Sequence, residues 1–266
     1  QQPNQTFKSQ NSNIQPSQIN IKQMKNIVLL TAKGGNQTLE NKNIIPINGK
    51  PSMAWSIQAA KESQKIDEIF VTTECPHIKR VAKEYDTIVI DRPEELSQPL
   101  SNHGDVIVHG VKEAQKILGV EIGLVTILLG NTVMTQTRDI DDTIDTVLSD
   151  EQIDSCMTVW KAQDDHPLRA MIINEEGYLE SFLKTETPDT NRQSYQDVYF
   201  YDQGPWTVRK STILRSEQTK EGPGPWWWMG KNCKAIERIW ATGRDTHTQF
   251  DVDISSAWLK TIRDKY

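Results

Sequence analysis

The chain has 266 residues, of which 36% are hydrophobic and 25% are charged, so it is long enough for one large domain or two small ones. Its formal net charge is −6, from 30 basic and 36 acidic residues that are interspersed along the sequence. This charge balance argues against general binding to nucleic acid or to anionic membranes, so an anionic ligand must be held by a local group of cations.

The N-terminal segment is polar and rich in Gln, Asn and Ser, and it has too few apolar side chains to offset the entropy cost of folding. We predict a disordered tail over residues 1–24 and one folded domain over residues 25–266. The tail lacks the pattern of a secretory signal, and the longest apolar run elsewhere, Ile122 to Leu129, is too short to span a bilayer. The sequence therefore predicts a soluble, cytoplasmic protein that does not contact a membrane.

From residue 25 onward, short apolar runs alternate with amphipathic segments, which is typical of βαβ units. We expect an α/β fold, a mostly parallel sheet with helices on both faces. The predicted strands are Asn26–Thr31, Glu68–Thr73, Thr87–Asp91, Leu124–Gly130 and Ser155–Trp160, and the predicted helices are Ser52–Ser63, Ile78–Tyr85, Asp105–Leu118 and Asp139–Leu148.

The alternation breaks down after Lys161. Residues from about 162 to 230 contain short strand-like runs with frequent Pro and Gly, which favours a β-rich, hairpin-containing insertion. The alternation then returns. We predict a strand over Ala235–Ala241, an extended segment FDVDI after it, and a last helix that begins at Ser255 or Ser256 and reaches Tyr266.

The loop after the first strand, AKGGNQTLENKN, lies where open α/β sheets collect ligands, beyond the carboxyl end of a strand. Gly34 and Gly35 can adopt positive φ and bring backbone N–H groups to phosphate oxygens, while Lys33 and Lys42 supply positive charge. An exposed Gly-Gly turn with solvated lysines is an equally good interpretation of this spacing alone.

Two further segments carry candidate polar groups. In an extended FDVDI segment, Asp251 and Asp253 point to the same side and can share one Mg²⁺, although a strand edge with two acidic residues is the commoner meaning of this pattern. Asn131 and Thr132 follow the most apolar strand and face the same crevice as the first loop. Without other information, a turn at the strand exit explains these two residues as well.

Several stretches together resemble the acylneuraminate (CMP-sialic acid) cytidylyltransferases. NIVLLTAKGGNQTLENKNIIPINGKP resembles the nucleotide loop of that family, which reads roughly A-R-x-x-S-K-G-x-x-x-K-N and continues into a turn and a helix. DRPEEL resembles the R-P-x-E-L segment, and LLGNTVMTQTR falls where the family has L-L-Q-P-T-S-P-L-R. NRQSY and FDVDI follow in the same order, so the resemblance covers residues 26 to 264.

The resemblance implies a nucleotide-diphospho-sugar-transferase-like fold and a reaction between CTP and an acidic 2-keto-3-deoxy sugar of the sialic or nonulosonic type, which yields a CMP-sugar and pyrophosphate. It implies Mg²⁺ as the cofactor and a homodimer in which the inserted region packs across the partner. The implied site has three parts: catalytic residues Lys33, Lys42, Asp251 and Asp253, the two aspartates also binding the metal; nucleotide-binding residues Thr31, Ala32, Lys33, Gly34, Gly35, Asn43, Arg92 and Asn131; and acceptor-binding residues Arg169, Arg192 and Gln203.

The chain also departs from the family pattern. Gln37 stands where the family has a loop lysine, and the loss of one cation beside a triphosphate can cost about 2.7–4 kcal/mol of transition-state stabilisation. His103 stands where the family often has Ser, and Gly130-Asn131 stands where it has Gln-Pro. These changes leave two alternatives open: cytidylyl transfer to a phosphate or phosphonate acceptor, and a nucleotide-binding subunit without catalysis.

Two aromatic features remain from the residues themselves. His103 and His109 have no evident third ligand or orienting partner, which disfavours a zinc site or a catalytic base. Trp226, Trp227 and Trp228 offer an aromatic wall for a sugar ring, but we favour packing of the inserted region or a subunit interface, because indole rings bury a large apolar area.

Overall fold

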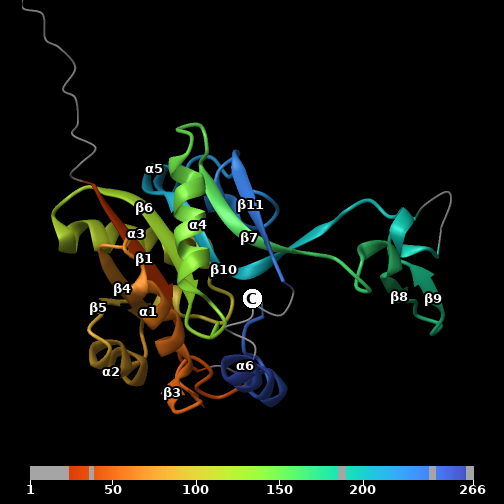
Figure 1. Cartoon of the computed structure of the whole chain (residues 1–266), viewed down its shortest axis with the longest axis horizontal. Coiled ribbons are helices and arrows are strands. Elements are labelled where there is room, and N and C mark those ends of the chain that lie inside the picture. The colour runs from red at the N-terminus through yellow and green to blue at the C-terminus, as the bar shows by residue number, and fades with distance from the viewer. Residues whose placement is uncertain (1–23, 36–38, 185–189, 240–243, 262–266) are drawn as a thin grey trace, which may run out of the picture.

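The computed structural model describes residues 24–35, 39–184, 190–239 and 244–261. Within these residues the chain forms a seven-stranded sheet in the order β11-β7-β10-β6-β1-β4-β5 (Figure 1). All neighbouring strands are parallel except β10, which runs antiparallel to both β6 and β7. The strands are β1 (Lys25–Thr31), β4 (Glu68–Thr73), β5 (Ile88–Asp91), β6 (Ile122–Leu129), β7 (Ser155–Lys161), β10 (Tyr199–Arg209) and β11 (Cys233–Arg238).

Helices cover both faces of the sheet, as the sequence predicts. In β1, Val28 and Leu30 pack into one apolar core, and Ile27 and Leu29 pack into the other. Because alternate residues of a strand point to opposite faces, a strand buried on both sides must be apolar throughout. The first core lies under α1 (Ser52–Glu62), α2 (Pro76–Glu84) and α4 (Thr137–Leu148), and the second lies under α3 (His103–Leu118), α5 (Lys210–Arg215) and the short 3₁₀ helix η5 (Trp227–Met229).

The predicted insertion is shorter than expected. The chain leaves the body after β7 and forms an arm that projects from it, and it returns through β10 (Figure 1). Residues from Tyr199 onward therefore belong to the body, because β10 is a strand of the main sheet. The arm carries a hairpin of β8 (Met171–Ile173) and β9 (Leu179–Ser181) and two 3₁₀ turns, η3 (Pro167–Arg169) and η4 (Arg192–Ser194).

The last helix begins earlier than predicted, and the expected extended conformation of FDVDI is wrong. Helix α6 spans Gln249–Thr261, so Asp251 and Asp253 lie in its first turns. Thr248 and Asp251 form a reciprocal cap: the Asp251 carboxylate accepts from the Thr248 backbone N–H (2.8 Å), and the Thr248 hydroxyl accepts from the Asp251 N–H (3.3 Å). Residues two apart in a helix differ by about 200° in direction, so these two carboxylates do not face one point.

Two short elements complete the connections near the sheet edge: the hairpin of β2 (Pro46–Ile47) and β3 (Lys50–Pro51), and the 3₁₀ helix η2 (Glu94–Leu96). The predicted tail over residues 1–24 falls almost wholly outside the described residues. Among the residues that are described, no helix has both the length and the apolar composition needed to cross a bilayer.

The tryptophan cluster packs directly on helix α3. Trp228 is 3% exposed, and a Cβ atom at Gly104 would lie 2.3 Å from a ring carbon of Trp227. A glycine is therefore required where α3 meets these rings, and packing, the interpretation favoured from the sequence, describes Trp228.

We expect Gly104→Ala to lower the free energy of unfolding by about 1–3 kcal/mol, because the added methyl group overpacks a closed contact with Trp227 and Trp228. Chemical denaturation measures this change. Gly123→Ala is the matched control, since a Cβ at Gly123 would meet its nearest neighbour only at 3.4 Å. Equal stability of the two variants would contradict the packing described here.

Candidate nucleotide site

The carboxyl ends of β1 and β6 lie side by side in the sheet, with Thr31 opposite Leu129. In open α/β sheets the crevice beyond such strand ends is the usual ligand site. The structure has a cavity of about 290 Å³ at this edge. Seven of the predicted nucleotide or catalytic residues line it, together with His103 and Asp245: Thr31, Ala32, Lys33, Lys42, Asn43, Arg92 and Asn131.

The segment that carries Lys42 and Asn43 is fixed by its own hydrogen bonds. The Asn43 side chain donates to the Lys33 carbonyl (2.7 Å), and the Ser52 hydroxyl at the start of α1 donates to the Lys42 carbonyl (2.6 Å). Asn43 is 3% exposed, and a Cβ at Gly130 would lie 2.8 Å from its Oδ1 atom. Gly130 therefore gives Asn43 the space to hold the first loop in place.

The two lysines bring positive charge to the cavity. Lys33 donates from Nζ to the Gln98 carbonyl at 2.8 Å. The Lys42 Nζ atom lies 3.4 Å from His247 Nδ1, and burial lowers the pKa of Lys42 while the nearby carboxylate of Asp245 opposes that shift. An anion that enters the cavity would stabilise the charged form of Lys42.

Arg92, predicted to bind the nucleotide, also forms hydrogen bonds within the protein that the sequence did not predict. Its guanidinium is almost fully buried and donates to the Thr72 carbonyl (2.6 Å) and the Ala32 carbonyl (3.4 Å), and it lies 3.9 Å from the carboxylate of Glu74. Arg92 thus joins the ends of β1 and β4 while it faces the cavity.

The backbone at the end of β1 is already engaged. The Thr31 carbonyl accepts from the Gly130 N–H (3.0 Å), and the Ala32 N–H donates to the Thr72 carbonyl (3.2 Å). Thr31 and Ala32 therefore present mainly their side chains to a ligand. Few backbone groups at this strand end remain available to a ligand.

The glycines of the first loop behave differently from each other. Gly35 has φ +61°, the left-handed conformation expected of a turn. The Gly34 N–H donates to a carboxylate oxygen of Glu74 at 2.7 Å, and a Cβ at Gly34 would lie 2.8 Å from Cys75. The Gly34 N–H is thus already paired with a carboxylate. Gln37, which stands where the family has a lysine, lies outside the described residues.

His103 forms part of the cavity wall through its contact with β1. Its Nε2 atom lies 2.9 Å from the Thr31 hydroxyl, and its ring packs edge-on against Trp206 and Trp228. Burial, with a smaller contribution from Arg92, lowers the pKa of His103 to about 4. The imidazole is therefore neutral near pH 7 and serves as a hydrogen-bonding group.

Asp245 is the site residue that the sequence analysis missed. It lines the cavity, accepts from the Asn131 side-chain amide at 3.0 Å and lies 2.7 Å from His247 Nε2. Asn131 is held further by donation to the Thr246 carbonyl (3.1 Å). The sequence signal was available: Asp245 is the acidic residue that follows β11, as Asn131 follows β6, but the D-x-D pattern drew the prediction to Asp251 and Asp253.

The predicted metal pair does not converge on the cavity. Burial would raise the pKa of Asp251, but Arg244, Thr248 and two backbone N–H groups hold it at about 2. Asp253 accepts from Gln249 on an exposed part of α6. No group of three His, Cys, Asp or Glu residues suited to a metal occurs within the described ranges. Asp245 and Asn131 instead place a carboxylate and an amide in the cavity, a set that suits Mg²⁺ completed by substrate phosphates.

The three predicted acceptor residues are dispersed. Arg169 lies on the arm, exposed, and pairs with Asp164 at 3.1 Å. Arg192 lies in η4 on the same arm, and its side chain is not described. Gln203 lies on β10, and its carbonyl accepts from the hydroxyl of Thr132, in the loop between β6 and α4, at 3.5 Å.

Comparison with known proteins shows to which family the chain belongs. Residues 27–218 match the family described as cytidylyltransferase. The chain is 24% identical over 199 residues to the N-acylneuraminate cytidylyltransferase of Streptococcus agalactiae, which covers 73% of the chain and 46% of that relative. It is 31% identical over 85 residues to the Escherichia coli O18:K1:H7 enzyme of the same name (32% and 20% covered) and 40% identical over 62 residues to the pseudaminic acid cytidylyltransferase of Campylobacter jejuni (23% and 27%).

Solved structures share the fold over nearly the whole described chain. A CMP:2-keto-3-deoxy-manno-octonic acid synthetase complexed with CTP matches with a TM-score of 0.67 at 17% identity, covering 89% of this chain and 98% of that one. The 4-diphosphocytidyl-2C-methyl-D-erythritol synthase of Anaerococcus prevotii matches with a TM-score of 0.61 at 17% identity, covering 90% and 98%.

The sheet topology and the solved structures together define an α/β fold with a mostly parallel central sheet. The chain belongs to the cytidylyltransferase family, as its resemblance to the acylneuraminate branch predicts. It spans between about a fifth and a half of the length of the curated relatives described above.

We expect Asp251→Asn to lower the free energy of unfolding by about 1–2 kcal/mol at pH 7, because it weakens the cap of α6 and the pair with Arg244. Asp253→Asn, on the same helix but exposed, is the control and should change stability little. Because the pKa of Asp251 is lowered in the folded state, its contribution is present above about pH 4 and is lost as the pH falls toward 2. Denaturation of both variants at pH 7 and pH 3 tests this. A difference in the free energy of unfolding between the two variants that is the same at both pH values would contradict it.

Proposed function

We propose that the chain transfers the cytidylyl group of CTP to an acidic 2-keto-3-deoxy sugar and releases pyrophosphate. The observation that carries this proposal is the single cavity in which Lys33, Lys42, Arg92 and Asn131 meet Asp245 at the carboxyl ends of β1 and β6. In a chain with a net charge of −6, this local cluster of cations suits a polyphosphate. The acidic sugars in the names of its relatives support the acceptor class.

The reaction requires a sugar hydroxyl held in line with the α-phosphate, and most of the rate comes from positioning and charge stabilisation. Lys33 and Lys42 would stabilise negative charge that develops on the phosphates. Asn43 holds the loop that carries Lys42, and Arg92 fixes the floor of the cavity. The neutral ring of His103 and the Thr31 hydroxyl form a polar wall against which the nucleoside can lie.

Mg²⁺ is the cofactor that we propose, and Asp245 with Asn131 would hold it beside the phosphates. When bound, it would supply positive charge for the α-phosphate and lower the pKa of the attacking hydroxyl. Asn131 keeps its orientation by donating to Asp245 and to the Thr246 carbonyl. Asp251, predicted to bind the metal, would instead support the site by capping helix α6.

We expect CTP with Mg²⁺ to raise the melting temperature of the protein, with UTP, ATP and GTP far less effective. A ligand at 100 times its Kd adds about 2.7 kcal/mol of stability. Asp245→Asn should remove the part of the shift that depends on Mg²⁺, whereas Asp253→Asn should retain it. A shift that is equal for all four nucleotides would contradict selectivity for CTP.

Pyrophosphate release then tests the acceptor class. With CTP and Mg²⁺, N-acetylneuraminic acid, pseudaminic acid and 2-keto-3-deoxy-manno-octonic acid should be the productive compounds, and neutral sugars should be inert. Release with none of the acids, despite a CTP-specific melting shift, would exclude the proposed transfer to these acceptors and leave a nucleotide-binding role.

We also propose that the chain forms a homodimer through the arm. Met171, Ile173, Tyr178, Leu179 and Phe182 are between 54% and 74% exposed on the β8–β9 hairpin, which projects from the body (Figure 1). Exposed apolar residues gathered on one element are typical of an association surface. A second copy of the chain is the partner that the resemblance to dimeric enzymes favours.

We expect Leu179→Asp combined with Phe182→Asp to convert the dimer to a monomer, because each charge would have to be buried without a partner at the interface. Sedimentation velocity measures the change, and Leu100→Asp, an exposed leucine of the body, is the control. A double variant that sediments as the wild-type protein does would contradict the arm interface.

A further inference from the structure

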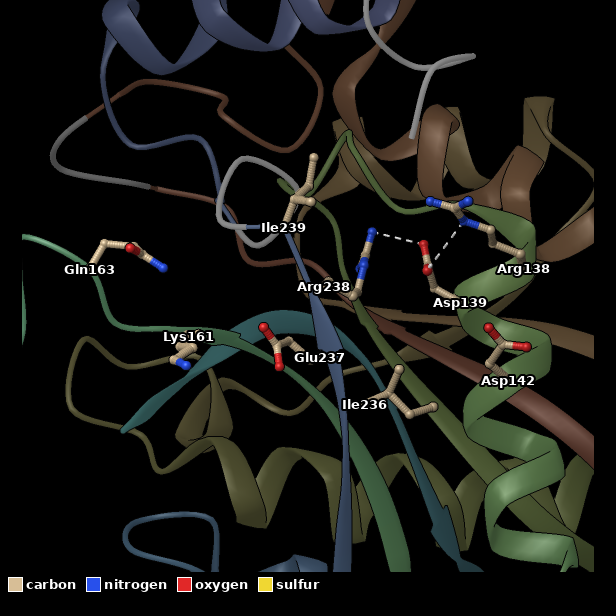
Figure 2. Close-up of a pocket in the computed structure, with 9 residues that line it drawn as sticks. All are labelled: Arg138, Asp139, Asp142, Lys161, Gln163, Ile236, Glu237, Arg238 and Ile239. Carbon is tan, nitrogen blue, oxygen red and sulfur yellow. Dashed lines mark ion pairs between the residues drawn. The ribbon is translucent and has the colours of Figure 1, made fainter. Parts of the chain in front are cut away.

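A second cavity, of about 660 Å³, lies at the carboxyl ends of β7 and β11 beside the start of α4. Figure 2 shows the side chains that line it, with Arg238 at the end of β11 directed toward Asp139 on α4. The side chain of Arg238 is 5% exposed, and those of Asp139 and Asp202 are 7% and 0% exposed. Arg238 and Asp139 line this cavity, and Asp202 is buried next to Arg238.

Arg238 connects three separate segments of the chain. It lies 2.8 Å from Asp139 at the start of α4 and 3.6 Å from Asp202 on β10. It also donates to the Gly204 carbonyl (3.1 Å) on β10 and to the Met134 carbonyl (3.4 Å) in the loop between β6 and α4. One side chain thus links β11 to β10, across β7, and to the loop that follows β6.

The β10 segment that Arg238 contacts is the one that carries Gln203. Asp202 accepts from the Thr158 hydroxyl and from the Gly204 N–H (3.0 Å), and its carbonyl accepts from the Trp206 indole N–H (3.0 Å). These bonds hold the residues on either side of Gln203. The pairing register between β7 and β10 also shifts between Tyr201 and Trp206. The regular backbone ladder is therefore interrupted at the residues that these side-chain hydrogen bonds hold.

The loop between β6 and α4 joins the two cavities. Asn131 lines the nucleotide cavity at one end of this loop, and the Met134 carbonyl accepts from Arg238 at the other. Between them, Thr132 donates to the Gln203 carbonyl (3.5 Å), while the Thr132 carbonyl accepts from Ser56. A displacement of Arg238 would therefore reach both Gln203 and the part of the loop around Met134.

The charge balance of this cluster indicates a role other than simple stabilisation. Burial raises the pKa of Asp202 to about 6 and also raises that of Asp139, while Arg238 lowers both. Desolvation of three charged groups offsets much of their attraction, so a buried cluster of this kind is weak evidence for stability. Its directional contacts to two backbone carbonyls instead define a geometry.

We propose that Arg238 is a positioning residue that sets Gln203 and the β6–α4 loop in register with the nucleotide cavity, and so orients the acidic sugar toward the α-phosphate of CTP. This inference rests on the proposed function. It differs from the predicted acceptor contacts in that Arg238 acts through the backbone of β10 and of the loop. The end of the loop that faces the nucleotide is held separately, because the Asn131 amide donates to Asp245 and to the Thr246 carbonyl.

The test uses Arg238→Met and Arg238→Lys, with Arg209→Met as the matched control. Arg209 also anchors backbone carbonyls, those of Val147, Ile153 and Asp150, but near the opposite end of β10. Two readouts are taken from the full chain: amide hydrogen exchange of residues 132–136 and 202–206, and steady-state kinetics with CTP and whichever of the three acids the wild-type protein uses.

We expect Arg238→Met to speed exchange in both segments and to lower kcat/KM for the acid about 100-fold, with KM for CTP within about twofold of wild type. Arg238→Lys should recover part of the loss, because an ammonium can pair with Asp139 but does not reproduce the guanidinium fork. Arg209→Met should lose stability without changing the exchange of these two segments. It should not lower kcat/KM for the acid selectively relative to the kinetics with CTP.

The proposal is overturned if exchange in both segments is unchanged in Arg238→Met, or if Arg238→Met and Arg209→Met alter the kinetics for acid and CTP by the same factors. Failure of the proposed function gives a different result: the wild-type protein would release no pyrophosphate with any of the acids. The proposed orientation of the acid would then fall together with the proposed function, while the exchange measurement would still report on the contacts of Arg238 with the two segments.

Discussion

The parallel pairing of β1 with β6 is the constraint on which the site depends. The central residues of these strands are buried on both faces and are mainly apolar, and polar residues appear soon after each strand reaches the edge of the sheet. Because the two strands run in the same direction, the segments that follow them emerge together, Lys33 from one and Asn131 from the other. The site is therefore formed from residues that are nearly one hundred positions apart, with no motif shared between them.

The buried groups beneath the cavity act on the same strand ends. Arg92 donates to carbonyls of both β4 and the segment after β1, and Gly130 leaves space for the Asn43 amide that holds Lys33. These contacts use hydrogen bonds that the backbone requires in any case, since an unpaired buried carbonyl costs free energy. Cations that face an anionic ligand are thus kept in place without an excess of positive charge on the protein.

The sequence predicts the parallel core well because burial on two faces leaves a clear signal. Glu68–Thr73 is a strand with the predicted bounds, and the four helices predicted between the strands are present with ends that differ by about two residues. The sequence did not place β10 in the central sheet. Its segment YFYDQGPWTVR contains Gly-Pro and an aspartate, which are typical of loops, and here the aspartate is buried only because Arg238, Thr158 and the Gly204 N–H satisfy it.

The sequence predicted the site residues whose place follows from their own segment. It missed those whose place depends on how distant segments pack together. Lys42 was recognised from its charge in the first loop and Asn43 from the resemblance of that loop to the family, and both line the cavity. Asp251 was misplaced because alternation in FDVDI was taken as a strand, whereas Thr248 and Asp251 form the capping pair of a helix. Thr248 lies three positions before Asp251, a spacing that an extended segment and a helix cap both allow, and only the packing of α6 against the body distinguishes the two.

The same comparison explains why Asp245 and Asn131 belong together. Each is the first polar residue with a carbonyl oxygen in its side chain after a strand of the sheet, and the hydrogen bond between them joins the exits of β11 and β6. Lys42 lies close enough for the Asp245 carboxylate to oppose part of the lowering of its pKa by burial. A carboxylate paired with a neutral amide, where two carboxylates would repel each other, leaves the cavity with less negative charge. Such a cavity is better suited to a triphosphate that brings its own negative charge and ligands for a cation.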